Sequence, residues 1–206
     1  MNRKIKNIIF DFGGVLVDLD KQACVDAFER IGAHAIAGYV DECRQEDLFH
    51  ELEIGNISVP RFCELARRQS GSTASDDDFC QAWNALLSGI SRRRLEALLR
   101  LRDHCRLALL SNTNTIHWKK AVEKLFPMDG LGVNDYFEET YLSYELHLLK
   151  PGQEIFEYVL RDLQVRADET LFVDDSAANC AGARLLGIHA LKAEGDEWIE
   201  KLNEMK

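Results

Sequence analysis

Four short runs of mostly apolar residues constrain the fold most. They are Ile8-Ile9-Phe10, Leu107-Ala108-Leu109-Leu110, Thr170-Leu171-Phe172-Val173 and Ile188-His189-Ala190-Leu191, with a weaker fifth at Thr140-Tyr141-Leu142. Short runs that do not alternate with polar residues are typical of parallel strands covered on both faces. Helical patterns lie between them, as over residues 155–163. The sequence therefore predicts an α/β fold with a doubly wound, Rossmann-like parallel sheet.

The interval between the first two runs is unusually long. It spans roughly ninety residues, far more than one crossover connection needs. Apolar residues at helical spacing recur there in groups that begin at Cys24, Leu48, Phe62 and Phe79. We therefore expect an inserted bundle of four helices. The predicted cap domain covers residues 19–88, and residues 1–18 and 89–206 form the α/β core.

Composition excludes several classes of partner. The formal net charge of −10 argues against a nucleic acid or an acidic membrane, because phosphate groups are bound by clustered Lys and Arg. The dense basic run Arg92-Arg93-Arg94 is more readily explained as a solvated helix start. No run is long enough to span a membrane, and the apolar stretch before Asp11 is too short for a signal peptide. We expect a cytosolic protein.

The cysteines have neither C-x-x-C nor zinc-finger spacing. We interpret all six as reduced residues, several of them in the core: Cys24, Cys43, Cys63, Cys80, Cys105 and Cys180.

Polar side chains stand where three of the predicted strands end. They are Asp11 after the first, Ser111-Asn112 after the second and Asp174-Asp175 after the third. Ligands of open α/β sheets bind at this edge, and Lys150, before a predicted helix, would reach it too. Carboxylates gathered there repel one another unless a cation lies between them. Mg²⁺ suits a few carboxylates that share it with a phosphate, so the pattern predicts a magnesium-dependent phosphoryl-transfer site.

Four segments, in this order, resemble the motifs of the haloacid dehalogenase-like hydrolases of the helical C1-cap subclass. They are Asp11-Phe12-Gly13-Gly14-Val15, Leu110-Ser111-Asn112, Lys150-Pro151 and Val173-Asp174-Asp175-Ser176. The resemblance covers essentially the whole chain. The second and fourth segments are similar to a subgroup of sugar-phosphate phosphatases that includes enzymes acting on α-D-glucose 1-phosphate. The resemblance implies a Mg²⁺-dependent phosphatase of a small phosphorylated metabolite, such as a sugar phosphate, that acts through a phospho-aspartate intermediate.

The resemblance also implies a role for each site residue. Asp11 would be the nucleophile and a magnesium ligand, together with Asp175 and the backbone carbonyl of Gly13. Asp174 would assist the metal through water or orient Lys150.

Other residues would hold the phosphoryl group. The resemblance implies this role for Ser111 and Lys150, with Asn112 assisting. Asn179, in the first turn of the helix after Asp175, is a weaker candidate that would support the site residues without touching the ligand. Gly13 and Gly14 would form the turn that follows the nucleophile, where we expect both glycines to supply permissive backbone dihedrals.

The sequence departs from the family at Gly13. Most of its phosphatases have an aspartate there, which acts as the general acid and contributes about 10²–10⁴-fold. An anomeric phosphate has a better leaving group and needs less of this help. Asp18 or Asp20 could supply the proton, although both fit better in the hinge to the cap. His117 could face the substrate, although core placement is the simpler interpretation.

Three alternatives stay open on the sequence. The first is a non-catalytic protein that binds a phosphorylated ligand and lost turnover with the acid. The second is a 2-haloacid dehalogenase, which would use Asp11 without Mg²⁺. The third is a phosphomutase, which normally needs the missing acid.

Overall fold

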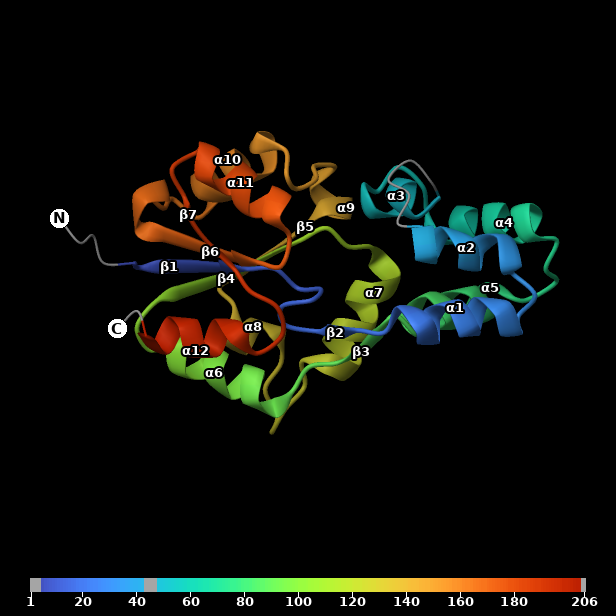
Figure 1. Ribbon diagram of the computed structural model, residues 1–206, viewed down its shortest axis with the longest axis horizontal. Coiled ribbons are helices and arrows are strands. Elements are labelled where there is room, and N and C mark those ends of the chain that lie inside the picture. Colours follow the sequence, from blue (N-terminus) through green and yellow to red (C-terminus); the bar gives the residue numbers. More distant parts are fainter. Residues whose placement is uncertain (1–4, 43–47, 205–206) are drawn as a thin grey trace.

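A five-stranded parallel sheet forms the centre of the computed structural model, which describes residues 5–42 and 48–204 (Figure 1). Its order is β5-β4-β1-β6-β7. The strands are β1 (Asn7–Phe10), β4 (Arg106–Ser111), β5 (Glu139–Leu142), β6 (Thr170–Asp174) and β7 (His189–Lys192). All five predicted strands, the weaker one included, are confirmed.

The pairing places the chemistry-bearing strand ends together. β1 is central, with Asn7 paired to Arg106 of β4 and to Thr170 of β6. Just beyond β1, the Asp11 N–H donates to Val173 O at 2.8 Å. Because all strand pairs are parallel, their carboxyl ends share one edge of the sheet.

Helices cover both faces of the sheet (Figure 1). One layer holds α6 (Arg92–Arg102), α8 (Val133–Tyr136) and α12 (Glu197–Glu204), and the other holds α10 (Gln153–Asp162) and α11 (Ala177–Leu185). The remaining core segments are α7 (Thr115–Lys120), the π-helical turn η1 (Ala121–Leu125), α9 (Ser143–Leu146) and the 3₁₀ turn η2 (Ala167–Glu169).

Neighbouring residues of one strand belong to different cores. Phe10 meets Trp198 edge to face at a centroid distance of 4.9 Å, whereas Ile9 packs in the cluster of Phe156 on the opposite face. A strand buried on both faces needs apolar residues at every position, which explains the uninterrupted runs in the sequence.

The inserted segment consists mainly of helices in its described part. Its helices are α1 (Lys21–Arg30), α2 (His34–Glu42), α3 (Leu48–Glu53), α4 (Val59–Ser70) and α5 (Asp76–Asn84). The expectation of four helices is wrong, because α2 was not predicted. Gly38 weakens the local helical preference of α2, which is stabilised by packing on α1. The five helices share one apolar cluster around Phe28, which Ile116 of α7 joins, and we propose that residues 19–88 form a cap domain.

A two-stranded ribbon connects the inserted helices to the sheet. β2 (Asp18–Leu19) and β3 (Leu87–Gly89) pair antiparallel, with Asp18 opposite Gly89. Neither strand was predicted, because two or three residues carry no periodic signal. Asp18 also forms an ion pair with the buried Arg94 at 2.8 Å.

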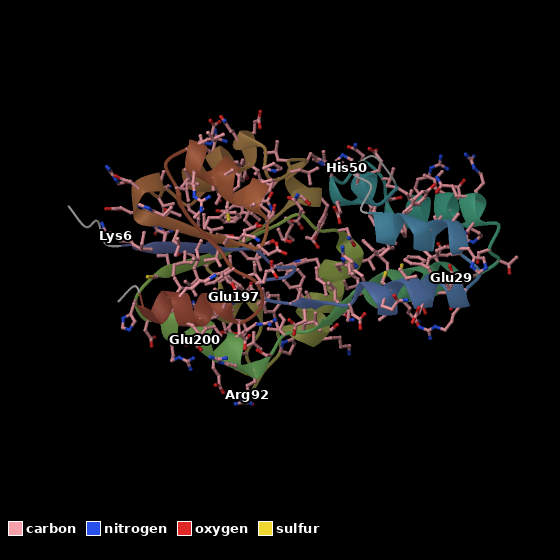
Figure 2. The ribbon with its side chains drawn as sticks, in the orientation of Figure 1. Lys6, Glu29, His50, Arg92, Glu197 and Glu200 are labelled. Carbon is pink, nitrogen blue, oxygen red and sulfur yellow. The ribbon has the colours of Figure 1, made fainter. Side chains whose placement is uncertain are left out.

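The basic run is not wholly solvated. Arg94 is buried and donates to Leu16 O at 2.9 Å, which corrects the interpretation of all three arginines as an exposed helix start. Arg92 pairs with Glu96 at 2.8 Å, and Arg93 pairs with Glu200. Figure 2 shows Arg92 and Glu200 on the outside of the molecule, away from the inserted helices.

None of the described cysteines forms a disulfide: Cys24, Cys63, Cys80, Cys105 and Cys180. Cys43 lies outside the described residues. In the part of the chain that the structure describes, no helix combines the length and apolar character needed to cross a bilayer.

Candidate active site

Three carboxyl groups converge at the carboxyl-end edge of the sheet. Asp11 follows β1, Asp174 ends β6, and Asp175 is the next residue. One carboxylate oxygen from each lies within 4.8 Å of the others. Asp11 and Asp174 are buried, and Asp175 is partly exposed.

The Lys150 ammonium lies against this cluster. Its Nζ is 2.7 Å from Asp11 Oδ1 and 2.8 Å from Asp174 Oδ2, and it donates to Leu110 O at 3.0 Å. Its side chain is almost completely buried. Burial alone would lower the pKa of Lys150, but the attraction of Asp11 and Asp174 outweighs it, and the pKa is raised. The lysine is therefore a permanent cation that fixes the positions of two carboxylates.

One ammonium does not neutralise three carboxylates. Burial and repulsion by Asp174 raise the pKa of Asp11 to about 7, despite the opposing effect of Lys150. Burial and Asp174 also raise the pKa of Asp175. A second cation would relieve this repulsion, and an all-oxygen set of carboxylates fits Mg²⁺. The donor set therefore fits the predicted metal.

Asp174 is held in a fixed orientation. Its Oδ1 accepts the Ser176 N–H at 2.7 Å, and Asn179 Nδ2 lies 3.1 Å from both carboxylate oxygens. Ser176 in turn caps α11 through its side chain. Lys150 Nζ donates to Asp174 Oδ2 at 2.8 Å, so three residues donate to this carboxylate, as expected for a group that orients its neighbours.

Asn112 contacts the main chain of Lys150. Its Oδ1 accepts the Lys150 N–H and its Nδ2 donates to Lys150 O, both at 2.9 Å. These two bonds keep the segment around Lys150 in a loop, so α10 starts only at Gln153. Pro151 therefore lies before the helix and not in its first turn.

The two glycines after Asp11 differ. Gly14 has a φ of +75°, and a Cβ there would overlap Asp175 Oδ2 and lie 2.9 Å from its Cγ. Gly13 has no such dihedral, and a Cβ there would meet only the two methyl groups of Leu19, at 3.5 and 3.8 Å. Glycine is required at 14 but not at 13, which corrects the expectation that both need unusual dihedrals.

Ser111 is buried as the last residue of β4, at the same edge as the carboxylates. Asp20 caps α1 by accepting the Ala23 N–H at 2.8 Å, and Asp18 pairs with Arg94, so both lie in the connection to the inserted helices.

His117 is buried, and its ring stacks on that of Trp83 with 4.5 Å between the ring centroids. Its Nε2–H donates to Trp83 O at 3.0 Å, and burial lowers its pKa to about 4. It is a neutral core histidine.

Sequence reasoning missed Ser143. Its Oγ accepts the N–H of Thr113, the residue that follows Ser111 and Asn112 in the sequence, at 2.9 Å. Ser143 follows the carboxyl end of β5, so the rule that placed the other residues at this edge could have found it.

Known proteins resemble this chain over nearly all its length. Residues 5–187 match the family described as haloacid dehalogenase-like hydrolase. A D-ribitol-5-phosphate phosphatase of Bacteroides thetaiotaomicron is 37% identical over 199 residues, which are 96% of this chain and 97% of the relative.

Solved structures agree with this likeness. A HAD family enzyme of Bacteroides thetaiotaomicron, in complex with magnesium and inorganic phosphate, is 40% identical with a TM-score of 0.88, covering 92% of this chain and 94% of that one. A predicted HAD-like family hydrolase from Porphyromonas gingivalis is 32% identical with a TM-score of 0.90, covering 98% and 97%.

Proposed function

We propose that this chain, which belongs to the haloacid dehalogenase-like hydrolases, is a Mg²⁺-dependent phosphatase of small phosphorylated metabolites. The observation that carries the proposal is the cluster of Asp11, Asp174 and Asp175 around the buried Lys150 ammonium. A similar phosphatase and a similar structure with magnesium and phosphate support it.

Asp11, Asp175 and the Gly13 carbonyl are the groups that would hold Mg²⁺. The bound cation would supply positive charge against the phosphoryl oxygens and the carboxylates. Asp174 is already committed to Lys150, Ser176 and Asn179, so its role is to orient the lysine and the surrounding loop.

The reaction proceeds by covalent catalysis at Asp11. Its carboxylate attacks phosphorus, the bond from phosphorus to the ester oxygen breaks, and the released alkoxide takes up a proton from the solvent. Water then attacks the phosphorus of the aspartyl phosphate, the bond to the Asp11 oxygen breaks, and inorganic phosphate leaves.

Two groups prepare Asp11 for this attack. The Phe12 N–H donates to Oδ1 at 2.7 Å and Lys150 Nζ lies 2.7 Å from the same atom, so Oδ2 is the oxygen that lacks these two contacts. Ser111, at the end of the neighbouring β4, would donate to the transferred phosphoryl group. Fixed donors of this kind stabilise developing charge without reorganisation.

The substrate is a phosphorylated polyol or sugar. The likeness to a D-ribitol-5-phosphate phosphatase, over nearly the full length of both chains, favours an alditol phosphate. The absence of an acid at Gly13 favours an anomeric phosphate such as glucose 1-phosphate, whose leaving group needs less protonation. Both belong in the substrate test.

A non-catalytic protein that binds a phosphorylated ligand is the second candidate, and Gly13 is the feature that favours it. A dehalogenase without metal would leave the clustered carboxylates uncompensated beside an anionic substrate, and a phosphomutase would need the acid that Gly13 lacks.

The test uses purified protein with Mg²⁺ and three substrates: p-nitrophenyl phosphate, D-ribitol 5-phosphate and glucose 1-phosphate. We expect phosphate release that stops with a chelator and is lost in Asp11→Asn, which keeps size and fold. Turnover unaffected by chelation would contradict the metal, and tight binding without turnover would establish the second candidate.

A further inference from the structure

The C-terminal turn of α3 brings main-chain groups of the inserted helices to the core. The last carbonyl groups of any helix lack partners within the helix. Those of His50, Glu51 and Leu52 accept amides of the turn that follows. The carbonyls of Glu53 and Ile54 instead find donors on the core.

Two side chains of the core cap this turn. Ser143 Oγ lies 2.6 Å from Glu53 O and 3.0 Å from Thr113 O, so its one hydrogen is donated to the nearer oxygen, that of Glu53. His147 Nδ1 donates to Ile54 O at 2.8 Å. The first pair is separated by 90 residues and the second by 93. Figure 1 shows α9, which begins at Ser143, next to α3.

The backbone of the same turn is pressed against α9. Gly55 has a φ of +76°, and a Cβ there would overlap Tyr144 O and lie 3.0 Å from the Tyr144 carbonyl carbon. We call this contact the α3 seat: Glu53, Ile54 and Gly55 on Ser143, Tyr144 and His147. It admits no side chain at Gly55 unless the turn moves away from the core.

The α3 seat is continuous with the candidate active site. The Ser143 hydroxyl that donates to Glu53 O also accepts the Thr113 N–H at 2.9 Å, and Ser143 is completely buried. Thr113 follows Asn112, which holds the main chain of Lys150 through two hydrogen bonds. One hydroxyl therefore joins α3 to the loop that orients the catalytic lysine.

We propose that the α3 seat fixes the inserted helices over the phosphoryl site, with Ser143 and Gly55 as positioning residues for turnover. The effect of Ser143 and Gly55 on turnover rests on the proposed phosphatase activity. Closure of a cap excludes water and completes a site, so a cap held out of place slows turnover more than it weakens phosphate binding.

Gly55→Ala tests the seat without touching the active-site loop. Its matched control is Gly71→Ala at the end of α4, where φ is +69° but no atom lies within 4 Å of an added Cβ. Both variants carry the same backbone strain, and only the first one clashes with the core.

Ser143→Ala tests the α3 seat from the side of the core, because it removes the hydroxyl that bonds Glu53 O. Its control is Ser72→Ala, which removes a buried hydroxyl that bonds Ile31 O and the Ala74 N–H within the inserted helices.

The kinetic readout is hydrolysis of p-nitrophenyl phosphate with Mg²⁺, together with inhibition by inorganic phosphate. We expect kcat to fall about tenfold in Gly55→Ala and Ser143→Ala and to stay within about threefold in both controls. The phosphate inhibition constant of Gly55→Ala should stay within about threefold, because its Thr113–Ser143 bond is intact.

Hydrogen–deuterium exchange at the amides of residues 54–57 is the second readout. We expect it to accelerate at least about tenfold in the two test variants but not in the controls. If the wild type hydrolyses no phosphate, this readout still decides whether the seat holds the turn, and only the proposed activity fails. Indistinguishable kcat and exchange in Gly55→Ala and Gly71→Ala would overturn the seat, even if Ser143→Ala does not fold.

Discussion

Replacing Gly14 by alanine should displace Asp175, a proposed magnesium ligand, while leaving the sheet intact. The Gly14 backbone cannot retreat easily, because its N–H donates to Val17 O at 2.9 Å and its carbonyl accepts the Gly195 N–H at 2.8 Å. The added Cβ, 2.9 Å from Asp175 Cγ, must therefore displace the Asp175 carboxylate. An alanine at positive φ costs about 1–2 kcal/mol, and disturbing the surroundings of a metal ligand typically costs about 10–100-fold in metal affinity.

Gly13→Ala is the matched control. Its Cβ meets only the flexible end of Leu19, at an ordinary contact distance of 3.5 Å. We expect Gly14→Ala to lose about 1–3 kcal/mol in urea unfolding and about 10–100-fold in Mg²⁺ affinity by calorimetric titration. We expect Gly13→Ala to stay within about 0.5 kcal/mol and threefold. Equal Mg²⁺ affinities for the two variants would refute the reasoning.

Two further predictions concern protonation. Gly13→Asp should raise kcat/KM for an alkyl phosphate by about 10²-fold, because the alkoxide leaving group needs an acid. p-Nitrophenolate does not need one, so kcat/KM for p-nitrophenyl phosphate should change little. An equal gain in Gly13→Asn would contradict this prediction. The pKa of Asp11 rises from 3.8 to about 7 on folding without metal, so the folded state binds this proton more tightly than the unfolded state. The stabilisation from that proton is present below pH 4 and is lost between about pH 4 and 7. Mg²⁺ competes with the proton, so the rise in Tm on adding Mg²⁺ should be larger at pH 7.5 than at pH 5, as measured by calorimetry against a chelator control. A Tm rise independent of pH would count against a metal bound at Asp11.

The sheet was predictable because burial on both faces imposes a strong local requirement. Each interior strand supplies apolar residues to two clusters, as Ile9 and Phe10 do, and no other element needs so short an unbroken run. The place of Asp11 and Asp174 followed from the same reasoning, since parallel strands end at one edge.

Contacts between distant segments were not predictable in this way. Nothing near Asn112 in the sequence indicates that its side-chain amide bonds the main chain of Lys150. Nothing near Gly55 indicates that the carbonyl of Tyr144 packs against it. α2 escaped prediction because its stability comes from tertiary packing more than from residue preference. The pairing of Lys150 with both Asp11 and Asp174 likewise depends on where a loop crosses the sheet edge.

The ribbon of β2 and β3 makes the two boundaries of the inserted helices neighbours in space. Asp18 and Gly89 face each other across that ribbon, although 70 positions of the chain, 19–88, lie between them. A tight turn could therefore replace residues 19–88, and another domain whose two ends lie equally close together could be inserted there. Such a replacement would leave the order of the sheet, and with it the positions of Asp11 and Asp174 on neighbouring strands, undisturbed, but it would remove the contact between α3 and Ser143. The inserted helices could therefore be exchanged without a change in the strands of the sheet.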